Sequence, residues 1–177
     1  MAIKPIVIYP DKRLRQKNER IETVTSEIQD LYQDMWDTMD ADDGAGISAC
    51  QIGLNLQMFI VNAKASDIYQ SNPICFINPE ITFYFEETEI EREGCLSFPG
   101  LWANVPRSKW IKVQYQDLHG THQELTASGL FAKVIQHETD HLSGKLFIDL
   151  MSNLQKSKVT KDYLKLKQSG LFLRKRP

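Results

Sequence analysis

The sequence contains few cysteines and no apolar stretch of about 20 residues, the length that a membrane-spanning helix needs. Its three cysteines, Cys50, Cys75 and Cys95, cannot form a disulfide framework without leaving one thiol over. Residues 1–5 lack the apolar core of a signal peptide, and they are too short and too acid-flanked for a transit peptide. We therefore expect a cytoplasmic protein with no membrane span and at least one cysteine free for chemistry.

Internal repeats and low-complexity segments are also lacking. The 177 residues are 42% hydrophobic and 25% charged, which suits one core, and we expect a single domain over residues 1–177. Residues 152–177 differ from the rest, because they hold eight Lys and Arg against one acid, Asp162. Apolar residues there fit a loosely amphipathic helix, namely Leu154, Val159, Tyr163, Leu164 and Leu166. A basic run of this kind is either a solvated face or a contact with nucleic acid.

Hydrophobic periodicity predicts an α+β fold. Residues 3–9 form an extended arm or terminal strand, and Ser26 with Gln29 makes a capping box for a helix that continues to Met39. Buried strands are expected at 56–61, 74–77 and 81–90, with a polar loop at 62–73. Residues 110–117 alternate and pair with 122–126 through a turn, so that His119 and His122 are expected to be exposed rather than to bind metal. We expect mostly antiparallel sheets around a central helix.

The central helix is predicted around residues 134–142, with the sequence VIQHETDHL. His137 and His141 lie four residues apart, so both imidazoles can reach one metal ion, with Glu138 beside a bound water. Ser128 suits the N-cap, and Gly144 suits a left-handed residue at the end of the helix. The rest of the helix is largely apolar, and buried histidines need a metal or other partners. The pattern alone also fits two core histidines held by hydrogen bonds.

A catalytic zinc-type site has three protein ligands and one open position. One protease pattern places a third histidine six residues after the second, but Phe147 stands there. Another pattern needs a downstream glutamate, and no glutamate follows Glu138. If the helix binds a catalytic metal, the third ligand must therefore lie upstream.

Two upstream segments can contribute to such a site. Residues 44–53, GAGISACQIG, have two glycines that allow close backbone approach, but they lack the features of a nucleotide-binding loop. Gln51 in this segment has an amide that can donate a hydrogen bond to a reacting oxygen. Cys95 follows Gly94 in a second segment, where the backbone can aim the sulfur and expose the Leu96 amide. The alternative for Cys95 is a small buried hydrophobe, the commonest state of a free cysteine.

Together these stretches resemble the three signature motifs of the peptide deformylases. The matching residues are Gly44-x-Gly46-x-Ser48-Ala49-x-Gln51, Glu93-Gly94-Cys95-Leu96-Ser97 and Gln136-His137-Glu138-x-Asp140-His141. The resemblance covers nearly the whole chain, including Tyr9-Pro10-Asp11 through Arg15 and Val105-Pro106-Arg107. Two positions depart from the pattern: the family more often has alanine at Ser48, and many members have a larger aliphatic residue at Ala45.

The resemblance implies that Cys95, His137 and His141 bind one divalent metal, commonly Fe(2+), with Zn(2+), Ni(2+) or Co(2+) able to occupy the site. A thiolate with two imidazoles suits several of these metals. The implied substrate is an N-formylmethionyl nascent peptide, whose formyl group is hydrolysed to formate. The resemblance to helical-tailed bacterial members also implies a contact between the basic tail and the ribosome.

The same resemblance assigns roles to other residues. Glu138 would move the water proton to the leaving amine, and the developing oxyanion would be held by the Leu96 N–H and the Gln51 side chain. Leu130 and Val134, seven and three residues before His137, would form walls for the methionine side chain, and Gly46 would lie beside the substrate. Two other functions share some of these features, namely a metal-dependent endopeptidase and a non-catalytic metal-binding or peptide-binding protein.

Overall fold

The protein is described by a computed structural model that covers residues 2–62 and 73–169. Its α-helices are α1 (Ser26–Ala41), α2 (Gly129–Leu142) and α3 (Asn153–Gln168). Short 3-10 helices lie at Lys12–Arg15, Ala49–Ile52 and Phe147–Leu150. The strands are β1 (Gly46–Ser48), β2 (Met58–Val61), β3 (Ile74–Tyr84), β4 (Thr88–Gly94), β5 (Trp102–Ser108), β6 (Trp110–Gln116) and β7 (His122–Ser128).

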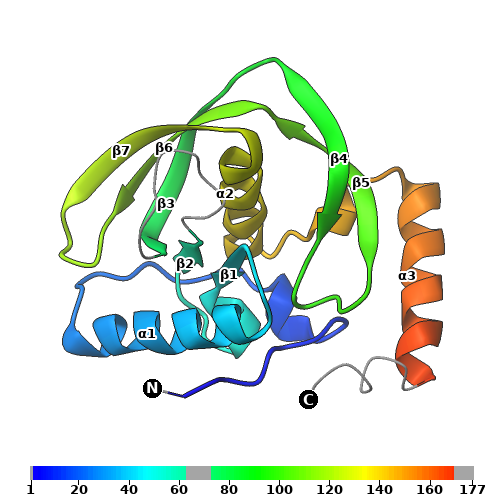
Figure 1. Ribbon diagram of the computed structural model, residues 1–177, viewed down its shortest axis with the longest axis horizontal. Helices are drawn as coiled ribbons and strands as arrows, with labels where there is room; N and C mark the ends of the chain where they lie inside the picture. Colours follow the sequence, from blue (N-terminus) through cyan, green and yellow to red (C-terminus); the bar gives the residue numbers. More distant parts are fainter. Residues whose placement is uncertain (1, 63–72, 170–177) are drawn as a thin grey trace.

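The strands form two antiparallel sheets, as Figure 1 shows. One sheet has five strands in the order β1-β2-β3-β6-β7, and β4 pairs with β5 in a separate two-stranded sheet. Helix α2 lies between the two sheets, α1 lies below the larger one, and α3 lies at the outer side of β5. The predicted α+β class with antiparallel sheets around a central helix is confirmed. None of the described helices is both long and apolar enough to cross a bilayer.

Helix α2 is fixed in place by a core that it shares with the large sheet. Phe131 and Ile135 on α2 pack against Phe76 and Val113 of the sheet, and all four side chains are buried. A second core joins α1 to β1, β2 and β3 through residues such as Met35, which is completely buried. Burying a side chain of this size contributes roughly 1.5–3 kcal/mol, so α1 and α2 are both held firmly against the large sheet.

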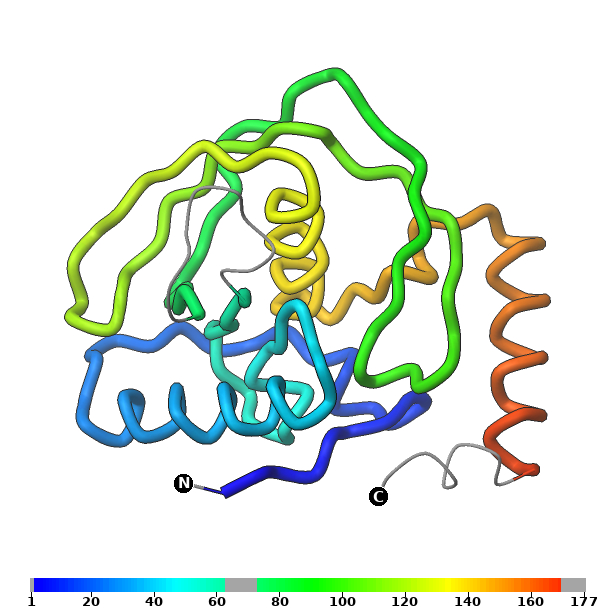
Figure 2. The backbone as a smooth tube through the Cα atoms, in the orientation of Figure 1, coloured from blue at the N-terminus to red at the C-terminus, as the bar shows by residue number. Residues whose placement is uncertain are grey.

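The N-terminal arm is extended, as expected, and it connects the 3-10 helix at Ala49–Ile52 with the loop that follows β4. The Val7 N–H donates to the Gln51 carbonyl at 2.7 Å, and the Tyr9 N–H donates to the Ser97 carbonyl at 2.9 Å. Figure 2 shows the arm in dark blue beside the loop that joins β4 to β5. The tail helix α3 docks nearby through Tyr163, which is 2% exposed, whereas Leu154 is 81% exposed and does not take part in this packing.

Several predicted boundaries are wrong. The strands expected at 74–77 and 81–90 are instead one strand over Ile74–Tyr84 and a second that begins at Thr88. Strand β3 continues through an irregularity at Asn78, whose φ is 50° and whose side chain bonds both the N–H and the carbonyl of Ile21. These hydrogen bonds compensate for the interrupted strand pairing. Residues 78–80, which the sequence suggested as a break between two strands, therefore lie within β3.

The capping box predicted at Ser26 and Gln29 is also wrong. The N-cap residue is Thr25, and the side chain of Gln29 donates instead to the Leu118 carbonyl at 3.3 Å. Strand β5 was not predicted, because it contains Pro106 and few apolar residues; an edge strand tolerates proline. The loop expected at 62–73 lies almost entirely outside the described residues.

Candidate metal centre

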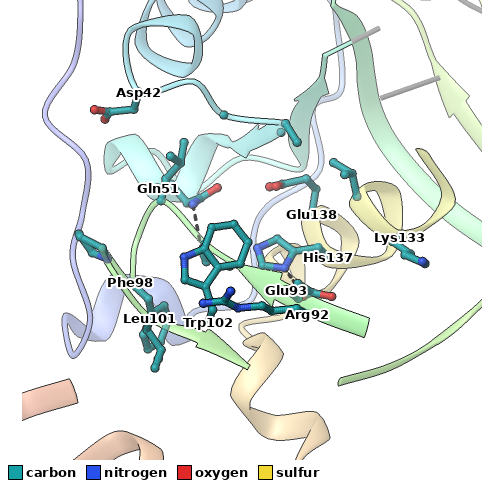
Figure 3. Close-up of a pocket in the computed structure, with 18 of the residues that line it drawn as sticks. Asp42, Gln51, Arg92, Glu93, Phe98, Leu101, Trp102, Lys133, His137 and Glu138 are labelled. Carbon is teal, nitrogen blue, oxygen red and sulfur yellow. Dashed lines mark hydrogen bonds and ion pairs between the residues drawn. The ribbon is translucent and has the colours of Figure 1, made fainter. Parts of the chain in front are cut away.

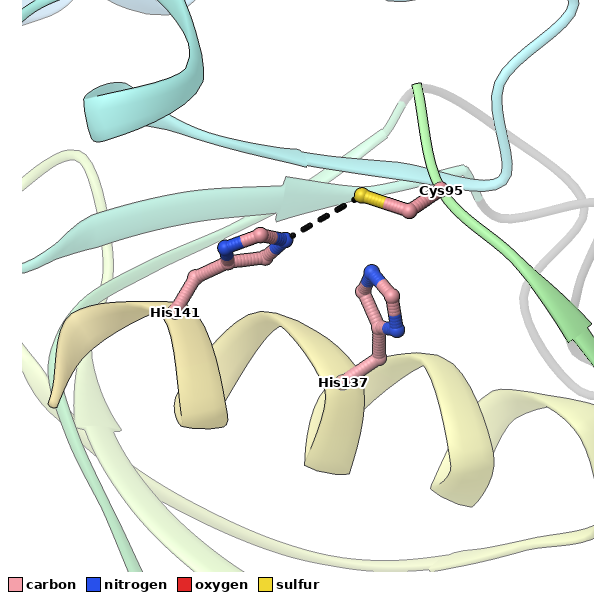
Figure 4. Close-up of side chains that lie close together, drawn as sticks. All are labelled: Cys95, His137 and His141. Atoms are coloured by element: carbon pink, nitrogen blue, oxygen red, sulfur yellow. Dashed lines mark hydrogen bonds between the residues drawn. The ribbon is translucent and has the colours of Figure 1, made fainter. Parts of the chain in front are cut away.

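Helix α2 presents both histidines on one buried face. His137 is 7% exposed and His141 is 1% exposed, and Cys95 approaches them from the loop that follows β4. One ligand atom from each of the three residues lies within 4.8 Å of the other two. The distance between the Cys95 sulfur and Nε2 of His141 is 3.4 Å, and Figure 4 shows all three side chains converging. Within the described residues, this cluster is the one group with metal-binding spacing.

The orientation of His137 is fixed from its other side. Its Nδ1 donates to Glu93 at 2.5 Å, and Arg107 donates to both oxygens of that carboxylate at 2.8 and 3.0 Å. Arg107 also donates to Asp140 on α2 at 2.6 Å. Burial raises the pKa of Glu93, yet hydrogen bonds from His137 and Arg107 outweigh it and hold that pKa at about 2. An ionised carboxylate behind a metal-binding imidazole is a common arrangement in proteins, because it fixes the ring and raises its basicity.

The donor set fits one divalent cation. Burial lowers the pKa of His137, but the Cys95 sulfur and Glu93 outweigh it, so this pKa is raised well above its usual value. Surroundings that favour a positive charge on His137 also favour a cation between its Nε2 and the sulfur. The pKa of His141 is lowered by burial and by His137, which leaves that imidazole neutral and free to bind metal. One thiolate and two imidazoles leave room for a further ligand at a four-coordinate metal.

Glu138 lies beside this cluster and is 2% exposed. Burial raises the pKa of its carboxyl, the direction that suits a group that accepts and releases a proton near neutral pH. The Ser48 hydroxyl donates to Oε2 of this carboxylate at 2.6 Å. Its Oε1 faces Gly46, where an added Cβ would lie 2.8 Å away from that oxygen and 2.7 Å from Val134. Glycine at this position therefore leaves room around the carboxylate.

Gln51 is held with its amide group facing the cluster. Its Oε1 accepts from the Ser48 N–H at 2.8 Å, so its Nε2 must point the other way, where it lies 3.5 Å from the Cys95 sulfur and 3.2 Å from the Ser97 hydroxyl. Figure 3 shows Gln51 opposite Glu138 and His137 across the cavity. The amide can therefore donate to an oxygen that enters between them.

A cavity of about 840 Å³ opens onto these side chains. Its lining includes every residue that the sequence proposed for substrate or oxyanion binding, namely Gly46, Gln51, Leu96, Leu130 and Val134. Leu130 is 57% exposed, whereas Val134 is 8% exposed, so the first stands at the mouth and the second deeper inside. His119 and His122 are exposed at the hairpin, as expected, and neither belongs to the cluster.

Reasoning from the sequence assigned no role to Glu93, Arg107 or Ser48, although all three stand in the stretches that resemble family motifs. The sequence carries no local signal for these contacts, because Glu93 is 44 residues from His137 and Arg107 is 33 residues from Asp140. The contact between Glu93 and Arg107 depends on how β5 folds back on β4.

Comparisons with known proteins agree with this geometry. A family model described as polypeptide deformylase matches residues 3–157. The peptide deformylase of Bartonella quintana (strain Toulouse) is 41% identical over 165 residues, which is 93% of this chain and 93% of that protein. The crystal structure of a peptide deformylase from Legionella pneumophila has a TM-score of 0.87 and 35% identity, covering 99% of this chain and 100% of that chain. That from Ehrlichia chaffeensis has a TM-score of 0.88 and 33% identity, covering 96% and 99%. The chain therefore belongs to the polypeptide deformylase family.

Proposed function

We propose that the cavity above Cys95, His137 and His141 is the active site at which this chain removes the N-formyl group from the formylmethionine of newly made polypeptides. Family membership supplies the reaction, and the observation that supports this site is the convergence of three metal-binding atoms beside the buried carboxylate of Glu138. The products are formate and a peptide with a free N-terminal amine.

A divalent metal held by Cys95, His137 and His141 would act as a Lewis acid and lower the pKa of a nearby water. Glu138 takes a proton from the attacking water and delivers it to the leaving amine, a dual use that suits a carboxyl whose pKa burial raises. The Gln51 amide and the Leu96 N–H donate hydrogen bonds to the oxygen on which negative charge develops.

The rest of the cavity positions the substrate. Val134 and Leu130 supply apolar walls for the methionine side chain, one deep and one at the mouth. Gly46 lines the same cavity, and its lack of a side chain lets Val134 and Glu138 lie directly against its backbone. A formyl carbon is small and fits the space beside Glu138 more readily than a peptide carbonyl does.

We infer from the family resemblance that the resident metal is Fe(2+). Zn(2+), Ni(2+) and Co(2+) should be able to replace it, because a thiolate and two imidazoles bind all of them. Protein prepared without oxygen should contain one iron per chain. One zinc per chain under those conditions would contradict the choice of iron and leave the site itself unchanged.

We further propose that the enzyme acts in the cytoplasm and that its basic tail contacts the ribosome. Exposed lysines on α3 support the second proposal, among them Lys158, Lys161 and Lys165. Such a contact should weaken as salt is raised, since counterions compete for the phosphates. A salt-independent interaction would argue against it.

The central test measures formate release from formyl-Met-Ala-Ser by protein prepared anaerobically with Fe(2+) or Ni(2+). Cys95→Ala should abolish turnover, whereas Cys75→Ala, which changes a buried cysteine packed between α1 and the sheet, should retain it. Digestion of casein would favour an endopeptidase instead. One bound metal per chain without formate release would favour a binding protein.

A further inference from the structure

Strand β4 carries three carboxylates at alternate positions, Glu89, Glu91 and Glu93. Alternate residues of a strand point to the same side, and here that side faces α2. Glu93 bonds His137, as described above. The other two carboxylates form ion pairs with Lys133, at 3.0 Å for Glu89 and closer for Glu91.

Lys133 is buried although it carries a charge. It is 9% exposed, and its side chain extends from α2 away from Gln51 in Figure 3. Its partners Glu89 and Glu91 are more open, with 38% and 47% of their side chains exposed. A buried ammonium group needs such partners, because transfer from water without them is unfavourable. The pairs therefore fix where the lysine and the strand lie relative to each other.

Lys133 and His137 are one helical turn apart on α2, on the same face. Two ionic clusters thus join α2 to β4, one at Lys133 and one at His137. Within residues 2–62 and 73–169 these are the polar side-chain contacts between the two elements. The part of β4 between them borders the cavity, together with Leu130 and Val134.

The other edge of β4 carries no strand. In the described part of the chain β4 pairs with β5 alone, and residues 89 and 91–94 line the cavity. An extended peptide can add to an unpaired edge through main-chain hydrogen bonds. The distance of this edge from α2 then decides where the first residue of a docked peptide lies relative to the metal ligands.

We propose that Lys133 is a substrate-positioning residue: through Glu89 and Glu91 it holds the edge of β4 against α2, so that a docked peptide places its formyl group beside Glu138. This inference rests on the proposed function. It predicts an effect on peptide binding, because the Glu93 and Arg107 contacts continue to hold the metal end of β4 when Lys133 is changed.

The test compares Lys133→Met with the unchanged protein, since methionine keeps the apolar stem and removes the charge. KM for formyl-Met-Ala-Ser should rise about five- to twenty-fold, the range expected for loss of a charge-assisted contact with partly exposed partners. We expect kcat to stay within about twofold and metal content to be unchanged. Formylmethionine amide lacks the later residues that would lie along β4, so its KM should change less.

Three further variants make the result specific. Lys133→Arg should restore KM, because a guanidinium can reach both carboxylates. A double variant, Glu89→Gln with Glu91→Gln, should raise KM as Lys133→Met does, and it removes the same pairs if the lysine variant fails to fold. Lys109→Met is the matched control, because its exposed pair with Glu87 lies outside the cavity lining, and its KM should stay unchanged.

Clear results would overturn the inference. One is a fall in kcat with KM unchanged, and another is an equal rise in KM for Lys109→Met. Equal changes for the tripeptide and for formylmethionine amide would also overturn it, since the effect would then not depend on β4. Absence of formate release by the unchanged protein would instead refute the proposed function, and it would be seen before any variant is made.

Discussion

Replacing Arg107 by methionine should destabilise the protein and weaken metal binding together. The Arg107 side chain is 5% exposed and donates three hydrogen bonds to Glu93 and Asp140, whose side chains are 15% and 16% exposed. Removing one partner of a buried ion pair typically destabilises by about 3–5 kcal/mol, because the remaining charges lose their compensation. Here Glu93 keeps His137, and Asp140 keeps an ion pair with Lys145 at 3.3 Å.

We therefore expect a loss of about 2–3 kcal/mol, below the usual range. For a protein of this size that corresponds to a fall in Tm of roughly 4–12 °C. Metal affinity should fall about ten- to a hundredfold, since Glu93 would no longer be held where it fixes the His137 ring. The assays are guanidinium unfolding of the metal-loaded protein and competition with a chelator of known affinity.

Arg13→Met is the matched control for this prediction. Arg13 also pairs with an aspartate, Asp11, but its side chain is 55% exposed, so its loss should change stability by less than about 0.5 kcal/mol. A double variant, Arg107→Met with Glu93→Gln, should lose less than the sum of the single losses, because the two groups share their contacts. Equal stability of the Arg107 and Arg13 variants, or additive losses in the double variant, would refute the reasoning.

Three other changes have definite expected outcomes. Glu138→Ala should keep one metal per chain, measured by elemental analysis, and lose formate release; full activity would show that another group moves the proton. Gly46→Ala should lower kcat and leave metal content unchanged, since the new Cβ would lie 2.8 Å from Oε1 of Glu138, and unchanged kinetics would show that the carboxylate moves freely. Burial raises the pKa of Asp149, but Arg15 and Lys156 outweigh it and hold that pKa at about 2. Because this lies below the unfolded value, Asp149 stabilises the fold at neutral pH, and its contribution of about 1 kcal/mol, after allowance for solvent screening, should be lost as pH falls from about 5 to 2. Unfolding curves of Asp149→Asn should lack this part of the pH dependence, and identical pH profiles would contradict the assignment.

The sequence by itself determined the elements whose signals are local. The 3.6-residue period set His137 and His141 on one face of α2, and Gly144 ends that helix region with the expected left-handed backbone, φ 72°. Alternation predicted β6 and its hairpin with β7. These features depend on residues that lie close together in the sequence, so the sequence alone is enough to predict them. Counting candidate ligands also predicted an upstream third ligand, and the choice of Cys95 came from the family resemblance.

Only the tertiary structure decided which distant residues meet at the site. Strand β5 folds back on β4 with Ala103 opposite Glu93 and Arg107 opposite Glu89, and the guanidinium of Arg107 lies between Glu93 and Asp140. The extent of β3 depended in the same way on the bonds between Asn78 and Ile21, 57 residues apart. Strand register and ion pairs across such separations follow from packing of the whole chain, because no local preference distinguishes the right partner from its neighbours.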